Sequence, residues 1–369
     1  MASSPSHSKK NGLWNSPWPP GCQRVPWLCT LFIMKKAVVV LPNWLGDFIM
    51  ALPSLLGALE EERTLLLGPK PFYTLLEGRY PPGCYLTLTK RGWSKVFQGS
   101  RLLLTRPVDR AALLPNSFLS ALMCLLGGVP RTWGLPTDGR RFLLHRRVPL
   151  PPGPIHQAEI YRHILEKAGL YRPWEGPIIH TSHQAKEKAQ ELWDKEGMEG
   201  EKVVVIHPFS SKEPRTWLPS RFHELVKRFI QRNLRVILLG SPRERKKAQA
   251  ILEGVESAAI NLTALEWGLG EMAAILERAS LFIGNDSGPG HLAAAVGTPT
   301  ITIHGSTAPH LTGPRGERAH HIWKAFPCSP CRERFFKECQ PAQENRPPCL
   351  EAITVEEVWE EAEKVLKGE

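Results

Sequence analysis

Three short segments of this chain place hydroxyl, carboxyl and basic side chains directly after an apolar run, and together they have the chemistry of a phosphate site. The segments are 43–47, 210–215 and 284–291. Serine hydroxyls and an arginine guanidinium donate hydrogen bonds to phosphoryl oxygens, and glycines let the backbone approach a ligand closely. We therefore expect these segments to bind an anion.

The stretch 284–307 has the most informative pattern, because it reads as a strand end, a glycine-rich turn, a helix, a second strand and a second glycine turn. Gly288 and Gly290 stand just before His291, which opens a short helix. The first N–H groups of a helix have no partner within it and favour an anion. The alternative is an ordinary turn in which the glycines only reverse the chain.

The first segment ends at Asp47, which follows an apolar run and precedes an apolar-periodic helix. In an open parallel sheet, ligands bind at the carboxyl ends of the strands, where Asp47 would lie. An acid in this turn is either the N-cap of the helix or a site group, and the residues alone leave both open. The second segment leaves the same choice, since Ser210 and Ser211 could be turn residues and Arg215 a solvated cation.

The rest of the chain alternates apolar strands with helical stretches, which is typical of a doubly wound α/β fold. We expect a strand at 101–105, helices at 118–126 and 156–169, a domain junction within 171–200 and a last helix at 354–367. No Gly-X-Gly-X-X-Gly follows the first strand and no Walker loop occurs, so a nicotinamide-linked enzyme and a Walker-type NTPase are both disfavoured.

Taken together, the three segments resemble the ADP-heptose:lipopolysaccharide heptosyltransferases of glycosyltransferase family 9. The resemblance covers about residues 35–369, and the Pro-Asn-Trp-Leu-Gly-Asp turn is most similar to the type II members. It implies a GT-B fold, with two Rossmann-like domains facing across a cleft and the donor mainly on the C-terminal one. We expect the acceptor-side domain at 34–185, the nucleotide-sugar domain at 186–350, and a helix at 351–369 that packs back toward the N-terminal domain.

The resemblance also assigns roles to single residues. Asp47 matches the carboxylate that deprotonates the acceptor hydroxyl, and Asp286 is expected on the heptose hydroxyls. The family's Lys-X-Trp motif is here Arg215-Thr216-Trp217, so Arg215 or Lys212 would be the phosphate cation. The full set of expected donor-binding residues is Gly46, Ser210, Ser211, Lys212, Arg215, Asp286, Ser287, Gly288 and His291, with Glu244 as a weaker candidate for the ribose and Trp267 for the adenine.

The function implied is inverting transfer of heptose from ADP-L-glycero-D-manno-heptose to the inner-core heptose of a lipid A-Kdo-heptose acceptor. No catalytic cofactor is expected, since the chain has no Asp-X-Asp dyad of the kind that metal-dependent transferases use. Two alternatives stay open: a family 9 transferase with another donor or acceptor sugar, and, more distantly, a GT-B nucleotide-sugar epimerase.

The chain is basic, with a net charge of +11 at pH 7. Clusters at 140–147 and 243–247 have no nucleic-acid-binding motif around them, so no nucleic-acid partner is expected. For an enzyme with a glycolipid acceptor they predict peripheral contact with the inner leaflet of the inner membrane, with solvated charge as the alternative. No apolar run approaches the roughly 20 residues of a membrane span, which favours a cytoplasmic protein.

Two regions do not belong to the transferase pattern. Residues 1–33 are rich in Ser, Pro and Trp, and we interpret them as a disordered extension or a start assigned too early, with Met34 as the true start. Cys328, Cys331, Cys339 and Cys349 cluster in a Pro-rich segment. They could bind a structural zinc, or they could be free or disulfide-forming thiols.

Overall fold

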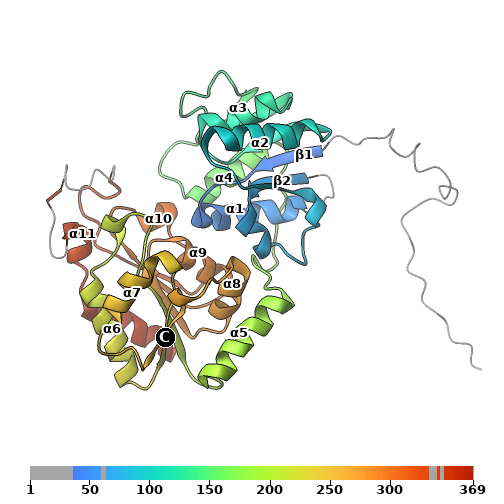
Figure 1. Cartoon of the computed structure of the whole chain (residues 1–369). Helices are drawn as coiled ribbons and strands as arrows, with labels where there is room; N and C mark the ends of the chain where they lie inside the picture. Colours follow the sequence, from blue (N-terminus) through green and yellow to red (C-terminus); the bar gives the residue numbers. More distant parts are fainter. Residues whose placement is uncertain (1–35, 60–63, 332–338, 341–344, 369) are drawn as a thin grey trace, which may run out of the picture. The chain divides into compact units, whose positions relative to one another are not determined.

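The computed structural model describes residues 36–59, 64–331, 339–340 and 345–368 (Figure 1). The expectation for residues 1–33 lies outside the described residues. Residues 35–369 form one compact unit, which contains two parallel sheets of six strands each. We refer to the residues around the first sheet as the N-terminal half and to those around the second as the C-terminal half.

The N-terminal sheet has the strand order β3-β2-β1-β4-β5-β6, and every described pairing in it is parallel. Val38 of the central strand lies opposite Leu65 on one side and Ala111 on the other. Strands buried on both faces read as continuous apolar runs, which explains the Val- and Leu-rich sequences. The strands are β1 Lys36–Val40, β2 Thr64–Pro69, β3 Tyr85–Leu88, β4 Val108–Leu113, β5 Arg131–Gly134 and β6 Arg146–Arg147.

Helices cover both faces of this sheet. Buried residues of α1 and α4 pack in one core cluster with one face, and those of α2 and α3 pack in another with the opposite face. The elements are α1 Leu45–Leu59, η2 Lys70–Leu75, η3 Pro82–Cys84, α2 Gly92–Leu104, α3 Phe118–Leu126 and α4 Gln157–Lys167.

The predicted strand at 101–105 is wrong, because these residues form the last turn and the cap of α2. The helix buries Val96, Gly99, Ser100 and Leu103, a spacing of three and four residues that only a helix turns to one side. Gly99 allows the close contact with α3, since a Cβ there would lie 2.1 Å from Sδ of Met123. The helices predicted at 118–126 and 156–169 are confirmed as α3 and α4.

The C-terminal sheet repeats the first, with the order β12-β11-β10-β7-β8-β9 and parallel pairing throughout its described strands. Numbered within its own half, this is again the order 3-2-1-4-5-6 of a Rossmann fold. Its strands are β7 Val203–His207, β8 Arg235–Leu238, β9 Ala259–Asn261, β10 Leu281–Asn285, β11 Thr300–His304 and β12 Ala319–Trp323. The predicted fold class, α/β with two Rossmann-like doubly wound halves, is confirmed.

The helical elements of this half lie on both sides of its sheet (Figure 1). They are α5 His183–Glu196, η4 Glu213–Arg215, α6 Pro219–Gln231, η5 Pro242–Glu244, α7 Arg245–Ile251, η6 Leu262–Ala264, α8 Leu269–Glu277, α9 Gly288–Ala295, α10 Pro309–Thr312, α11 Pro348–Glu351 and α12 Val355–Lys367. No described helix is long and apolar enough to span a membrane.

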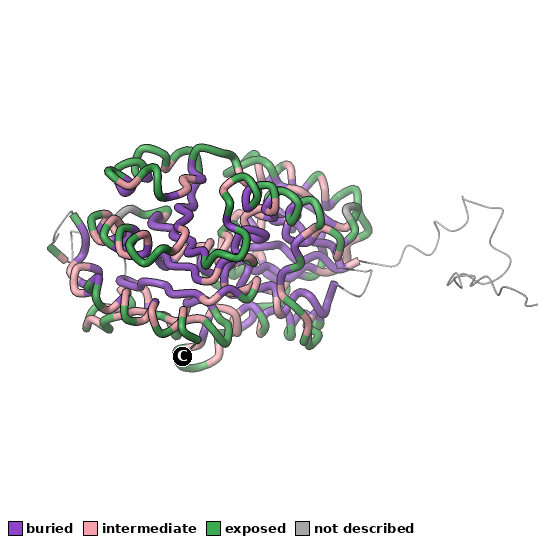
Figure 2. Tube along the Cα trace, turned by 90° about the horizontal axis from the view of Figure 1, so that it is seen from below, coloured by how far each residue is buried: buried purple, intermediate pink, exposed green. Residues whose placement is uncertain are grey.

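The last helix departs from expectation. Val355, Val358 and Ala362 of α12 are buried in a core cluster with β7, β10 and α6, so the helix packs on the C-terminal half and not back toward the N-terminal one. Its amphipathic pattern requires an apolar partner, and the nearest face that supplies one is that of its own half. Figure 2 shows buried segments running through the interior, with more exposed segments around them.

Candidate active site

A cavity of about 670 Å³ lies where the carboxyl ends of β1, β7 and β10 meet. This is the switch point of each sheet, where a doubly wound fold binds its ligand. All three predicted segments line it, so the structure brings the expected residues together although their places in the sequence are far apart. The predicted residues in its lining are Gly46, Asp47, Ser210, Ser211, Lys212, Arg215, Glu244, Asp286, Ser287, Gly288 and His291.

Asp47 lies in the first turn of α1 and is half-buried. The hydroxyl of Tyr161 on α4 donates a hydrogen bond of 2.7 Å to its Oδ1. Burial raises the pKa of Asp47 most strongly; Tyr161 lowers it, Asp286 raises it and Arg215 lowers it, and the net result is an increase. A carboxylate with a raised pKa is a stronger base, so Asp47 is suited to accept a proton.

Gly46 brings this turn against the C-terminal half. A Cβ at Gly46 would lie 2.9 Å from Cδ2 of His291, and one at Gly288 would lie 2.8 Å from Cβ of Leu45. Both distances are too short for a real side chain, so each glycine is required by the close approach of α1 and α9. Burial lowers the pKa of His291 to about 4, so its imidazole is neutral at pH 7.

Asp286 and Arg215 both line the cavity and form an ion pair, with 2.8 Å between Nη2 of Arg215 and Oδ2 of Asp286. The Thr307 hydroxyl donates a second hydrogen bond of 2.7 Å to the same oxygen. Burial raises the pKa of Asp286, but His304, Arg215 and the Thr307 hydroxyl lower it by more, so the group stays ionised. The predicted phosphate cation therefore also orients the predicted sugar-binding carboxylate.

The start of α9 offers only some of its backbone N–H groups to an anion. Pro289 has no N–H, and the N–H of Gly290 donates to the carbonyl of Ser287. Neither position is available to an anion, so fewer N–H groups at the start of this helix can bind a phosphate than the general pattern of a helix N-terminus provides. The hydroxyl of Ser287 lies 3.4 Å from Nδ1 of His207, a buried histidine whose pKa burial lowers to about 4.

Trp217 anchors the loop that carries Ser210, Ser211 and Arg215. It is fully buried, its backbone N–H donates to Oδ1 of Asn285 over 2.7 Å, and its indole N–H donates to the Ile353 carbonyl over 2.9 Å. Asn285 directly precedes Asp286, so one hydrogen bond fixes two of the three segments to each other.

The two weaker candidates have different outcomes. Glu244 lines the cavity, and its carboxylate also accepts hydrogen bonds from the Ser241 N–H and hydroxyl at the start of a helical turn. Trp267 does not line the cavity: it packs against the hydrophobic core, and its buried indole N–H has no partner among the described residues.

Several lining or supporting residues were not predicted. Tyr161 and His207 carried no local signal, because their role depends on contacts with distant parts of the chain. Thr307 could have been found, since it ends the second glycine turn of the 284–307 pattern. Trp44 also lines the cavity and is 66% exposed beside Asp47.

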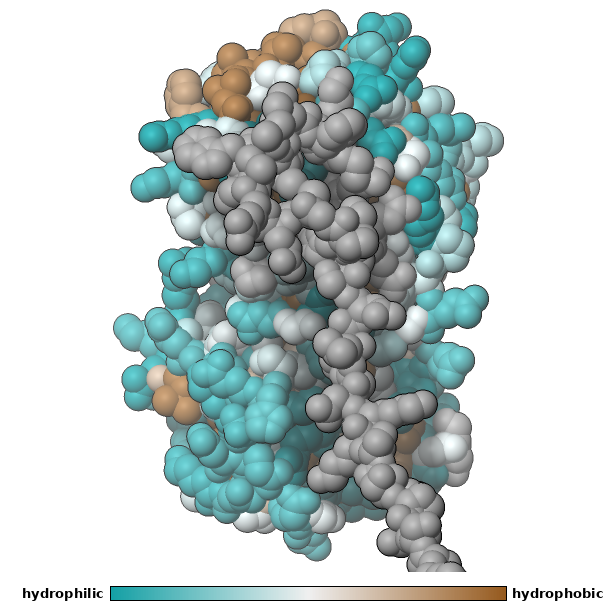
Figure 3. Space-filling model, turned by 90° about the vertical axis from the view of Figure 1, so that its right-hand side faces the viewer, coloured by the Kyte–Doolittle hydropathy of each residue, from teal (hydrophilic) through white to brown (hydrophobic). Residues whose placement is uncertain are grey.

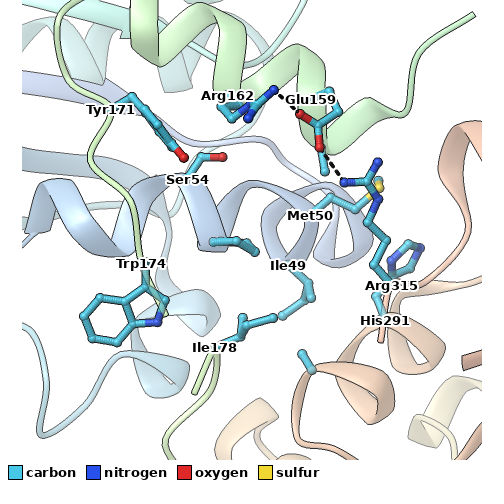
Figure 4. Close-up of a pocket in the computed structure, with 13 residues that line it drawn as sticks. Ile49, Met50, Ser54, Glu159, Arg162, Tyr171, Trp174, Ile178, His291 and Arg315 are labelled. Atoms are coloured by element: carbon cyan, nitrogen blue, oxygen red, sulfur yellow. Dashed lines mark hydrogen bonds and ion pairs between the residues drawn. The ribbon is translucent and has the colours of Figure 1, made fainter. Parts of the chain in front are cut away.

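A second cavity, of about 230 Å³, is lined by residues of α1, α4 and α9 (Figure 4). Met50 and His291 line both cavities, so the two are neighbours. Glu159 pairs there with Arg162 over 2.8 Å and with Arg315 over 2.6 Å, and Figure 4 shows it between them. Asp47 does not line this cavity, so the acid-base chemistry belongs to the larger one.

The four clustered cysteines, Cys328, Cys331, Cys339 and Cys349, line one small cavity of about 90 Å³. Burial, together with the three other thiols, raises the pKa of the Cys349 thiol to about 11. Within the described ranges, no three His, Cys, Asp or Glu side chains are arranged so that they could hold a metal ion. The structural zinc therefore stays a prediction.

Two doubly wound halves that share a polar cavity at their switch points have the GT-B architecture. The family model for glycosyltransferase family 9 (heptosyltransferase) matches residues 97–340, and the chain belongs to this family.

Named relatives agree with this assignment. Lipopolysaccharide heptosyltransferase 2 of Escherichia coli K12 is 26% identical over 331 residues, which cover 78% of this chain and 87% of that protein. Lipopolysaccharide heptosyltransferase 1 of Pseudomonas aeruginosa is 38% identical over 133 residues, 35% of this chain and 36% of that protein. The structure of E. coli ADP-heptose heptosyltransferase II superimposes with a TM-score of 0.71 at 23% identity, covering 90% of this chain and 99% of that one, which shows the shared fold.

Proposed function

We propose that this chain transfers heptose from ADP-L-glycero-D-manno-heptose to the inner-core heptose of lipopolysaccharide, as a type II heptosyltransferase does. The observation that carries the proposal is the shared cavity, which holds a base, Asp47, opposite the Ser210, Ser211 and Arg215 set. The family match and the near-full-length similarity to E. coli lipopolysaccharide heptosyltransferase 2 support it.

In the proposed reaction, Asp47 removes the proton of the acceptor hydroxyl as its oxygen attacks the anomeric carbon of the donor. The bond between that carbon and the phosphate oxygen breaks, and ADP leaves with the electron pair from the opposite face. The configuration at the anomeric carbon is inverted. Asp47 then carries the proton until it is released to water.

The charge that develops on ADP requires positive and hydrogen-bonding groups already in place. Arg215 is fixed by Asp286, and the hydroxyls of Ser210 and Ser211 line the same cavity. Preoriented donors of this kind contribute strongly to catalysis, because they need little rearrangement in the transition state. We therefore propose that transfer needs no divalent metal.

The most specific part of the proposal is that the chain adds the second heptose and not the first. The local similarity to a type 1 enzyme at 38% identity favours, as a second candidate, addition of the first heptose. The two reactions differ in the acceptor: a heptose-bearing Kdo-lipid A for the second, and Kdo-lipid A without heptose for the first.

The test is a transfer assay with ADP-heptose and each of the two acceptors, run with and without EDTA. We expect product only from the heptose-bearing acceptor, at a rate that EDTA changes by less than about twofold. Product only from the heptose-free acceptor would replace the type II assignment by type I. Loss of activity with EDTA, restored by Mg²⁺, would overturn metal independence alone.

A further inference from the structure

The outer face of α2 exposes large apolar side chains in a row. Trp93, Phe97 and Leu104 are 60%, 66% and 66% exposed, and Arg101 lies between the last two. Residues spaced by three and four lie along one side of a helix, so these four form a stripe. Isolated exposed apolar residues are ordinary, but a continuous row of them marks an interaction surface.

The neighbouring helix extends this surface. Leu125 and Leu126 at the end of α3 are 53% and 47% exposed, and Phe142 is 73% exposed with its ring centroid 6.1 Å from that of Phe118. Helices α2 and α3 bury their inner residues in the same core cluster on one face of the sheet. Their outer residues therefore face the same way. Figure 3 shows hydrophobic surface gathered at the top, the end of the molecule where α3 lies in Figure 1.

The segment that carries this apolar face is strongly basic. Residues 90–147 contain eleven Lys and Arg against two Asp, so this segment carries most of the net charge of +11. Arg91, Arg101, Arg106, Arg141, Arg146 and Arg147 are exposed. Arg140 is not part of the surface, because it is fully buried and donates to the carbonyls of Pro115 and Leu135.

The face begins beside the active site. The ammonium of Lys95, in the first turn of α2, bonds to Oδ1 of Asn43 in the turn that leads to Asp47. The first turn of α2, which carries Trp93, therefore lies against the turn that leads to Asp47, while Leu104 and Leu126 are at the other ends of the two helices.

We propose that this face, formed by Trp93, Phe97, Arg101, Leu104, Leu125, Leu126 and Phe142, docks on an anionic lipid bilayer. Aromatic and aliphatic side chains enter the boundary between headgroups and acyl chains, and arginines pair with lipid phosphates. Self-association through this face is disfavoured, because two copies would oppose like charges. The inference deepens the proposed function and rests on it for its purpose, since an acceptor anchored in the bilayer would then reach Asp47 from the docked side.

The test is co-sedimentation of the full chain with vesicles of phosphatidylcholine alone and of phosphatidylcholine with phosphatidylglycerol. We compare the wild type with the Phe97→Gln/Leu104→Gln variant and, as the matched control, with Leu265→Gln, which removes a 52% exposed leucine from the C-terminal half. Glutamine keeps helix propensity, and thermal unfolding checks that each variant is folded. An Arg101→Glu variant tests the charge separately.

We expect the wild type and Leu265→Gln to bind the anionic vesicles, and the Phe97→Gln/Leu104→Gln and Arg101→Glu variants to bind about tenfold more weakly. Equal binding of all four proteins, or equal binding to both kinds of vesicle, would overturn the proposal. So would a wild type that sediments as a dimer and becomes monomeric in Phe97→Gln/Leu104→Gln. Vesicle binding needs no donor or acceptor, so its result is independent of whether the proposed transfer reaction is correct.

Discussion

Asp47 and Tyr161 are the residue pair on which the proposed acid-base chemistry depends. The base must be ionised to act, so transfer should fall as the pH decreases through the pKa of Asp47, which burial raises. The Tyr161 hydroxyl lowers that pKa by donating to Oδ1. We therefore predict that Tyr161→Phe moves the acid limb of the kcat/KM profile to higher pH and leaves the rate at high pH nearly unchanged.

A matched control for this prediction is Tyr171→Phe, at a tyrosine that lines the smaller cavity of about 230 Å³. The control should keep the wild-type pH profile. An unshifted acid limb in Tyr161→Phe would mean that Asp47 does not titrate in the reaction.

At this scale the sequence predicted types of residue well and their interactions poorly. Ser210, Ser211 and Asp286 could be recognised because they lie in the turns after strands whose carboxyl ends meet at one edge. The pairing of Arg215 with Asp286 could not, since it depends on how two loops fold onto each other. Trp267, only a weaker candidate for the adenine, packs against the core, as an isolated tryptophan often does.

Helices α1 and α9 approach each other through glycines, and this approach places the base beside the donor site. A Cβ at Gly46 would require His291 to move, because it would lie 2.9 Å from Cδ2. We predict that Gly46→Ala lowers kcat/KM by about tenfold to a hundredfold, since small displacements of a catalytic group are costly.

The control is Gly83→Ala, where no atom lies within 4 Å of the added Cβ and the backbone needs no positive φ. It should have wild-type kinetics. If Gly46→Ala were as active as this control, the contact between the two helices would have no catalytic role.

Helices with a clear apolar periodicity could be predicted from the sequence. Segments whose secondary structure or packing depends on a distant part of the chain could not. The helices α3 and α4 end at glycine-containing turns, and the sequence predicts both. The end of α2 has an apolar run, Leu102 to Leu104, that fits a buried strand as well as a helix, and only the contact of Gly99 with α3 decides between them. The packing of α12 depended on which half offered an apolar face.

At the scale of the whole molecule, several buried histidines among the described residues are kept neutral near the site. Burial lowers the pKa values of His207, His291 and His304 to about 4. In the unfolded chain these groups bind protons near pH 6.5, so the folded state loses stability as the pH falls from about 6.5 toward 4. Asp286, with its lowered pKa, adds a loss at still lower pH, whereas Asp47, with its raised pKa, has the opposite effect.

We predict that the free energy of unfolding, measured by urea denaturation, is lower at pH 5 than at pH 7. His304→Gln should reduce this difference, whereas His183→Gln, at a histidine whose side chain is 89% exposed, should not. A pH dependence that is the same in all three proteins would show that His304 is not kept neutral by the fold.

The central claim is that one cavity joins a general base to a donor site, and replacing Asp47 tests it most directly. The measurement is transfer from ADP-heptose to a heptose-bearing Kdo-lipid A by the wild type and by Asp47→Asn, with ADP-heptose binding measured by calorimetry on both. We expect Asp47→Asn to bind the donor with nearly unchanged affinity and to lose at least about a hundredfold in kcat. A wild-type rate in Asp47→Asn, with donor binding intact, would contradict the account.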